Sequence, residues 1–123
     1  MTDFTINGQT YRATKMDALK QFHVSRRLLP VLSSVAQVIK QGLTDPMEAL
    51  PLVAEALSGM SEDNANYVLN ACLDHCQRQQ GAQFVKIRSG GGLMFEDIDM
   101  PTMMQISWKV LEDNLGNFLK DPS

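Results

Sequence analysis

The chain has 123 residues, of which 44% are apolar and 20% are charged, and its formal net charge is −3. This is the composition of an ordinary folded domain, and it excludes a disordered chain, which would combine low hydropathy with high net charge. Its apolar runs are far shorter than the roughly 20 residues that span a bilayer. Met1 is followed by Thr2 and Asp3 rather than by a basic and apolar leader. We therefore expect a single domain, residues 1–123, that makes no membrane contact.

Charge is unevenly distributed along the chain. Residues 1–40 carry six Lys/Arg against two Asp/Glu, whereas residues 41–123 carry five against twelve. Such asymmetry can steer a charged partner or promote a homo-oligomer, although an ordinary solvated surface is the simpler interpretation.

The first residues predict a β-hairpin. Two apolar, β-favouring runs, Phe4–Ile6 and Thr10–Arg12, flank Asn7-Gly8. Asn-Gly is the preferred pair for a type I′ turn, because both central residues must adopt positive φ. We expect these runs to pair as antiparallel strands.

Helical spacing follows the hairpin. Thr14 is a candidate N-cap with Asp17 three residues on, and the helix after it would bury one face consisting of Met16, Leu19 and Phe22. Pro30 interrupts the pattern, but apolar residues continue at helical spacing from Leu28 to Ile39. This predicts one kinked helix or two, ending at Gly42.

Two further helices have clear start signals. Asp45-Pro46 opens a third helix, which we expect to be short or bent at Pro51 and to stop at Gly59. Ser61 caps a fourth helix, with a buried face that includes the two cysteines and a polar end at residues 77–80.

The last forty residues predict a small β element and a long helix. Phe84–Ile87 alternates like a strand, Ser89–Gly92 is a turn, and Leu93–Phe95 is a candidate return strand. Pro101 opens a helix with one apolar face consisting of Met104, Trp108, Leu111, Leu115 and Phe118. The predicted fold class is therefore mainly α (α+β), with four to five helices, an N-terminal β-hairpin and a small second β element near residues 83–95.

One cluster has metal-ligand residue types, Cys72-x-x-His75-Cys76. On a helix this spacing could converge on one ion, but structural zinc usually takes four ligands from two separate knuckles. Both cysteines fall on the apolar helix face, where a free cysteine packs as a small hydrophobe. Two cysteines four apart on one helix also have poor disulfide geometry. We therefore favour a core role and a reducing compartment, and predict no cofactor and no enzymatic activity.

Two patterns bear on phosphate and nucleic acid. Ser89–Gly92 lacks the Lys-Ser/Thr and helix start of a phosphate loop, and Leu93 follows it instead. Arg26 and Arg27 make the first helix basic, but the acidic net charge and the lack of a recognisable DNA-binding motif argue against nucleic acid as the main partner. A small nucleic-acid-binding regulator remains the alternative function.

Methionines gather near the glycine-rich segment. The chain has eight, and Met94, Met100, Met103 and Met104 lie close together in sequence. Methionine adapts to irregular apolar partners, although core packing is the simpler interpretation for any single one. Their grouping beside Phe95 predicts a partner-binding region between residues 89 and 104.

The N-terminal residues carry a longer pattern. It reads Phe4-x-Ile6-x-Gly8-x-x-Tyr11, then Lys15-Met16-Asp17-Ala18-x-x-Gln21-x-x-Val24-x-Arg26-Arg27-Leu28-x-Pro30. It resembles the opening of tail assembly chaperones from long-tailed bacteriophages and their prophages. The resemblance implies a small, mostly helical, non-catalytic protein of the bacterial host cytoplasm that holds the tape measure protein and helps recruit tail tube subunits. On this view Arg26 and Arg27 steer acidic partner segments, and the apolar contact comes from Met94, Phe95, Met100, Met103 and Met104.

Overall fold

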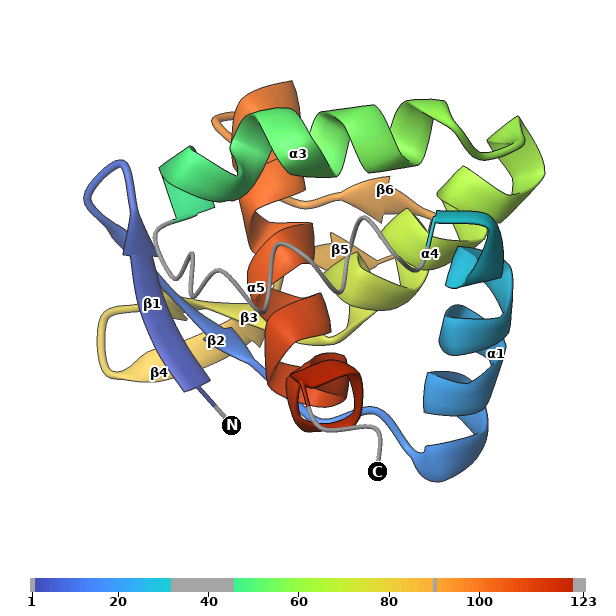
Figure 1. Ribbon diagram of the computed structural model, residues 1–123. Coiled ribbons are helices and arrows are strands. Elements are labelled where there is room, and N and C mark those ends of the chain that lie inside the picture. Colours follow the sequence, from blue (N-terminus) through green and yellow to red (C-terminus); the bar gives the residue numbers. More distant parts are fainter. Residues whose placement is uncertain (1, 32–45, 90, 121–123) are drawn as a thin grey trace.

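The computed structural model describes residues 2–31, 46–89 and 91–120 (Figure 1). The elements in chain order are β1 (Thr2–Ile6), β2 (Gln9–Ala13), α1 (Ala18–Leu28), a 3-10 turn η1 (Leu29–Val31), α3 (Pro46–Ser58), α4 (Glu62–Asp74), β3 (Cys76–Gln80), β4 (Gln83–Lys86), β5 (Arg88–Ser89), β6 (Gly92–Leu93) and α5 (Met100–Lys120).

Four strands form one antiparallel sheet in the order β1-β2-β3-β4. The predicted hairpin is present, with Phe4 opposite Tyr11, and the turn residues Asn7 and Gly8 have φ values of 52° and 80°. Positive φ at both positions is what a type I′ turn requires. Tyr11 in turn lies opposite Arg78 of β3, so the hairpin is tied to a strand from much later in the chain.

The predicted fold class was wrong in its treatment of the β structure. The hairpin is not a separate small element, because β3 joins it to β4 in a single four-stranded sheet of an α+β fold. The residues of β3 were assigned to the end of a helix, yet α4 ends at Asp74 and Cys76–Gln80 is extended. Cys76 and Arg78 are buried at a spacing of two, which is a strand period, so the helical spacing of Cys72 and Cys76 was misleading.

The pairing predicted for the second β element was also wrong. The strand at residues 83–86 pairs with β3, while Arg88–Ser89 pairs with Gly92–Leu93 as a separate two-stranded ribbon, β5–β6. The Met94 amide donates to the Ile87 carbonyl at 2.7 Å, which extends the ribbon by one bond. The glycine-rich turn therefore closes a short ribbon rather than the larger hairpin.

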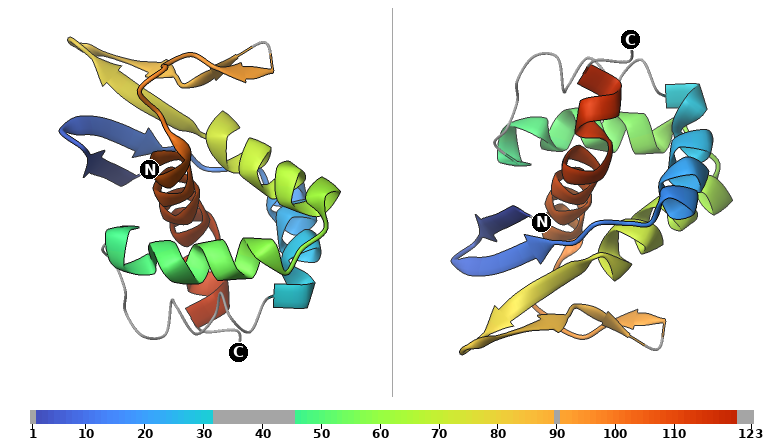
Figure 2. Two further views of the ribbon diagram at one scale, coloured as in Figure 1. Left: turned by 90° about the horizontal axis from the view of Figure 1, so that it is seen from above. Right: turned by 90° about the horizontal axis from the view of Figure 1, so that it is seen from below.

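Helix α5 occupies the centre of the molecule. Figures 1 and 2 show it between the sheet and α1, with α3 crossing it. Its buried apolar side chains are Met104, Ile106, Trp108, Val110, Leu111 and Leu115, and the polar Thr102, Gln105 and Ser107 are buried as well. A helix that is buried on nearly every side is a core helix, so α5 is the element that the others pack against.

The helix starts follow the capping signals with one shift. Ser61 caps α4 by accepting from the Asn64 amide, and Asp99 accepts from the Thr102 amide at the start of α5. The N-cap of α1 is Asp17, which accepts from the Lys20 amide at 2.7 Å, rather than Thr14. α3 continues through Pro51. The further helix expected between Pro30 and Gly42 lies, apart from η1, outside the described residues, as does Asp45.

Candidate functional site: two exposed apolar surfaces

One exposed surface lies on α1. Leu19, Phe22, Arg26 and Leu29 recur at spacings of three and four residues, which places them along one side of the helix. The side chains of Leu19, Phe22 and Leu29 are 66%, 59% and 61% exposed. We call these four residues the α1 stripe. The prediction that Leu19 and Phe22 face the core was wrong, because α1 buries Val24 and Leu28 instead.

Polar contacts anchor α1 at both ends, so its outward face is fixed. Near the start, the Asn114 side chain of α5 accepts from the Met16 amide at 2.7 Å and donates to the Thr14 carbonyl at 3.1 Å. Near the end, the Arg27 guanidinium donates to the Asn64 side chain at 2.9 Å and lies 4.2 Å from the ring centroid of Tyr67. Arg27 is thus engaged with α4, whereas Arg26 is exposed.

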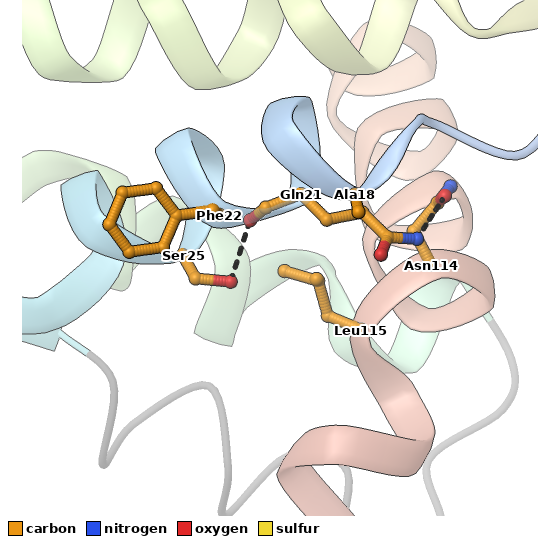
Figure 3. Close-up of a pocket in the computed structure, with 6 residues that line it drawn as sticks. All are labelled: Ala18, Gln21, Phe22, Ser25, Asn114 and Leu115. Carbon is orange, nitrogen blue, oxygen red and sulfur yellow. Dashed lines mark hydrogen bonds between the residues drawn. The ribbon is translucent and has the colours of Figure 1, made fainter.

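A pocket opens beside the α1 stripe. It encloses about 260 Å³ and is lined by Ala18, Gln21, Phe22, Ser25, Asn114 and Leu115. Figure 3 shows Leu115 reaching from α5 toward α1, with Phe22 at the far end of the lining. The Ser25 hydroxyl donates to the Gln21 backbone carbonyl at 2.8 Å, and the Gln21 side-chain Nε2 donates to the Asn114 side-chain oxygen at 3.3 Å. Much of the polar lining is therefore already hydrogen-bonded within the protein. The pocket therefore suits an apolar side chain.

The second exposed surface contains part of the methionine group. Leu93, Met94 and Met100 are 39%, 59% and 67% exposed. Phe95 and Met103 are half-buried against the core, and Met104 is buried. The structure thus places three of the five predicted apolar site residues in or against the core and leaves Met94 and Met100 accessible.

An arginine clasp holds the segment from Leu93 to Met100 against the sheet. Arg78, whose side chain is 9% exposed, donates to both carboxylate oxygens of Asp97 at 2.8 and 3.0 Å. Its guanidinium also lies 4.3 Å from the centroid of Phe95. The hydrogen bond from Arg78 holds the pKa of Asp97 below its usual value, so this carboxylate stays ionised. The clasp fixes the segment between Leu93 and the start of α5.

The two surfaces carry charges of opposite sign. Arg26 is exposed on the α1 stripe, and Lys15 and the N-cap Asp17 are exposed before its first residue, so the surroundings of the stripe are basic overall. No ion pair among the described residues includes any of these three. The segment from Leu93 to Met100 contains the exposed acids Glu96, Asp97 and Asp99 and no basic residue. Hydrogen bonds from Thr102 lower the pKa of Asp99, which keeps it charged. We call residues Leu93–Met100 the acidic segment.

The structure does not bring the predicted basic and methionine residues together. Arg26 and Arg27 lie in the last turn of α1, whereas the methionines follow the β5–β6 ribbon, and Figure 2 shows these elements apart. Sequence reasoning missed Leu19, Phe22 and Leu29 as surface residues. The available signal was a second apolar spacing in the same helix, Val24 to Leu28, that competes for the buried face.

The cysteine and histidine residues form no ligand group. Cys72 and Cys76 are free thiols buried in the core, on α4 and β3. Burial raises the pKa of both thiols, that of Cys76 to about 12. His75 Nδ1 lies 2.8 Å from the Ala71 carbonyl. No group of three or more His, Cys, Asp or Glu placed to hold a metal ion occurs in residues 2–31, 46–89 and 91–120. The thiols therefore act as packing groups.

Comparison with known proteins identifies the family. No curated protein and no solved structure matches the chain. Among the described helices, none is long and apolar enough to cross a membrane. A family model described as phage tail assembly chaperone protein, TAC, matches residues 7–123, which extends the resemblance of the N-terminal residues over nearly the whole sequence. The chain belongs to the phage tail assembly chaperone family.

Proposed function

We propose that this chaperone acts without catalysis in the cytoplasm of the bacterial host, binding the tape measure protein and tail tube subunits during tail assembly. The observation that carries the proposal is the exposure of six large apolar side chains among the described residues of a chain of this family. Exposed apolar patches of this kind mark surfaces that bind other proteins. The buried thiols, whose pKa values are raised, offer no nucleophile to a substrate.

Of the seven binding residues expected from the sequence, we propose three, Arg26, Met94 and Met100, as contacts with the partner. Met94 and Met100 are accessible and adapt to irregular apolar partners. Arg26 is exposed and can attract acidic segments. Arg27 supports α1 through Tyr67 and Asn64. Phe95 and Met103 are half-buried against the core and Met104 is part of it, so we do not place these three residues in the contact with the partner.

Co-expression with the tape measure protein tests this function. We expect the tape measure protein to stay soluble and to co-purify with the native chaperone. The triple variant Arg26→Glu, Met94→Ser, Met100→Ser should lose most of the co-purified protein while remaining folded, because all three positions are exposed.

A matched control reverses a charge elsewhere. Lys86→Glu with Gln83→Ser alters two exposed positions on β4 and should leave capture unchanged. If the tape measure protein aggregates beside a folded native chaperone, the proposed function is wrong. If the triple variant captures it as well as the native chain does, the residue assignment is wrong.

A further inference from the structure

The α1 stripe and the pocket beside it form one continuous apolar surface. Phe22 belongs to both, because it is part of the stripe and also lines the pocket. Ala18 and Ser25, on the same lining, are small and leave room in the pocket for a side chain of another molecule. From Leu19 to Leu29 the surface is about 15 Å long, at 1.5 Å per helical residue. A partner must therefore match it over about three helical turns.

The main polar side chain of this surface already uses its hydrogen-bonding groups within the protein. Asn114 Oδ1 accepts from the Met16 amide at 2.7 Å and from Gln21 Nε2 at 3.3 Å. Its Nδ2 donates to the carbonyls of Thr14 and Val110 at 3.1 and 3.0 Å. Asn114 therefore has no group left for the backbone of an extended peptide. A helix needs no such partner, because its own backbone groups are hydrogen-bonded along its length. The surface thus favours a helical partner.

The charge around the surface indicates the charge of that partner. Arg26 is exposed within the stripe, and Lys15 is exposed before its first residue. Asp17 is the one acid in residues 14–29, and its side chain caps the helix by accepting from the Lys20 amide at 2.7 Å. The border is basic overall, so acidic side chains on a partner are attracted and basic ones are repelled.

We propose that this surface binds an amphipathic helix of the client, with large apolar side chains at i, i+3 or i+4, and i+7, bordered by Asp or Glu. One apolar side chain enters the pocket of about 260 Å³ between Ala18 and Ser25. Its neighbours pack on Leu19 and Leu29, and an acid pairs with Arg26. We call this surface the helix site. It rests on the proposed function and deepens it by giving the chemistry of one client segment.

Overlapping peptides of the tape measure protein test the partner. Peptides of about 20 residues are long enough to form a helix on binding, and fluorescence polarisation measures their affinity for the full chain. We expect the tightest binders to share the acidic amphipathic pattern and to gain helical circular dichroism when bound. A proline at the centre of such a peptide should abolish binding, because it breaks the helix. Scrambled peptides of the same composition are the control.

A pocket-filling variant tests the site. Ala18→Leu closes the pocket without changing the charge, and its position is exposed, so the fold should be kept. The affinity for the peptide should fall at least about tenfold, because the entering side chain loses its place. A surface that merely attracts apolar groups would instead bind more tightly. The matched control Ala54→Leu makes the same substitution at an exposed position of α3 and should leave the affinity unchanged.

A charge exchange tests the border. Arg26→Glu should weaken binding of the acidic peptide at least about threefold, as expected for one exposed ion pair. The same variant should bind a peptide whose acids are replaced by lysine more tightly than the native chain does, because the two charges are exchanged across the contact.

Three results would overturn the helix site. They are bound peptides without the acidic amphipathic pattern, an Ala18→Leu variant that binds as tightly as the native chain, and an Arg26→Glu variant with an unchanged charge preference. Capture of the whole tape measure protein by the native chain is measured in parallel. Capture together with any of these three results removes the helix site and leaves the proposed function intact. A loss of capture by the folded native chain removes both.

Discussion

Helices α5 and α1 have similar apolar spacing in sequence but differ in how much of their apolar surface is buried. α5 buries Ile106, Trp108 and Val110 at 1% exposure or less, on more than one side of the helix. α1 buries only Val24 and Leu28 and leaves Leu19 and Phe22 in solvent. The difference comes from position, because α5 has the sheet on one side and helices on the other, whereas α1 packs at the edge (Figure 1). Apolar spacing alone thus identifies a helix without saying which of its faces is covered.

The largest expected effect is a difference in stability between two variants, one that truncates an aromatic side chain of α5 and one that truncates an aromatic side chain of α1. Trp108→Ala in α5 should lower the free energy of unfolding by about 3–5 kcal/mol, because it removes a fully buried side chain and leaves a cavity. Phe22→Ala in α1 should change it by less than about 0.5 kcal/mol, since this ring is mostly exposed. Urea denaturation measures both. Equal losses would mean that Phe22 is part of the core and the α1 stripe is not a free surface.

A smaller effect is expected where the two helices are joined. Asn114→Ala removes the acceptor of the Met16 amide and the donor to the Thr14 carbonyl, so it should cost about 1–3 kcal/mol. Amide hydrogen exchange should rise at the start of α1 and not in the middle of α5. The control Asn66→Ala lies on the exposed side of α4 and should affect neither quantity. If Asn114→Ala leaves amide hydrogen exchange at the start of α1 unchanged, α1 is oriented by the packing of Val24 and Leu28 alone.

The smallest effect concerns pH and the acidic segment. The pKa of Asp97 is lowered in the folded state by Arg78, so its contribution to stability is present above the unfolded pKa of about 4. That contribution is lost as the pH falls through the folded pKa. Asp97→Asn should therefore flatten part of the decline in stability between about pH 5 and 2. Glu55→Gln, at an exposed position of α3, is the control. An unchanged acid profile in Asp97→Asn would show that the clasp does not hold the segment.

Local signals predicted the elements that local chemistry determines. The Asn7-Gly8 turn, the Ser61 cap and the start of α5 near Pro101 each depend on residues within a few positions, and all three occur in the structure. The strand at Cys76–Gln80 pairs with Gln83–Lys86 nearby and with Gln9–Ala13 far away in sequence. It was missed because its polar residues lack the apolar alternation that marks a strand. Cys76 also lies at helical spacing from Cys72 of the preceding helix.

The candidate site was only partly visible in the sequence for a related reason. Met94 and Met100 were chosen for their chemistry and are exposed, whereas Met104 has the same chemistry and is buried. Exposure depends on how the segment is held, and the clasp by Arg78 comes from a strand that the sequence did not reveal. The sequence did not reveal which face of α1 is exposed, because Leu19 and Phe22 have the same apolar spacing as a buried face.

The central place of α5 also sets the order of events during synthesis. The ribosome delivers α5 after every other described element, yet β1, β2, α1, α3 and α4 all pack against it. The hairpin that emerges first must wait for β3 to complete its sheet and for α5 to cover it. Until then the nascent chain exposes the apolar side chains that will later form its core. Partly folded chains that expose such surface are prone to aggregate. This member of a chaperone family is thus itself prone to aggregation until α5 has been made.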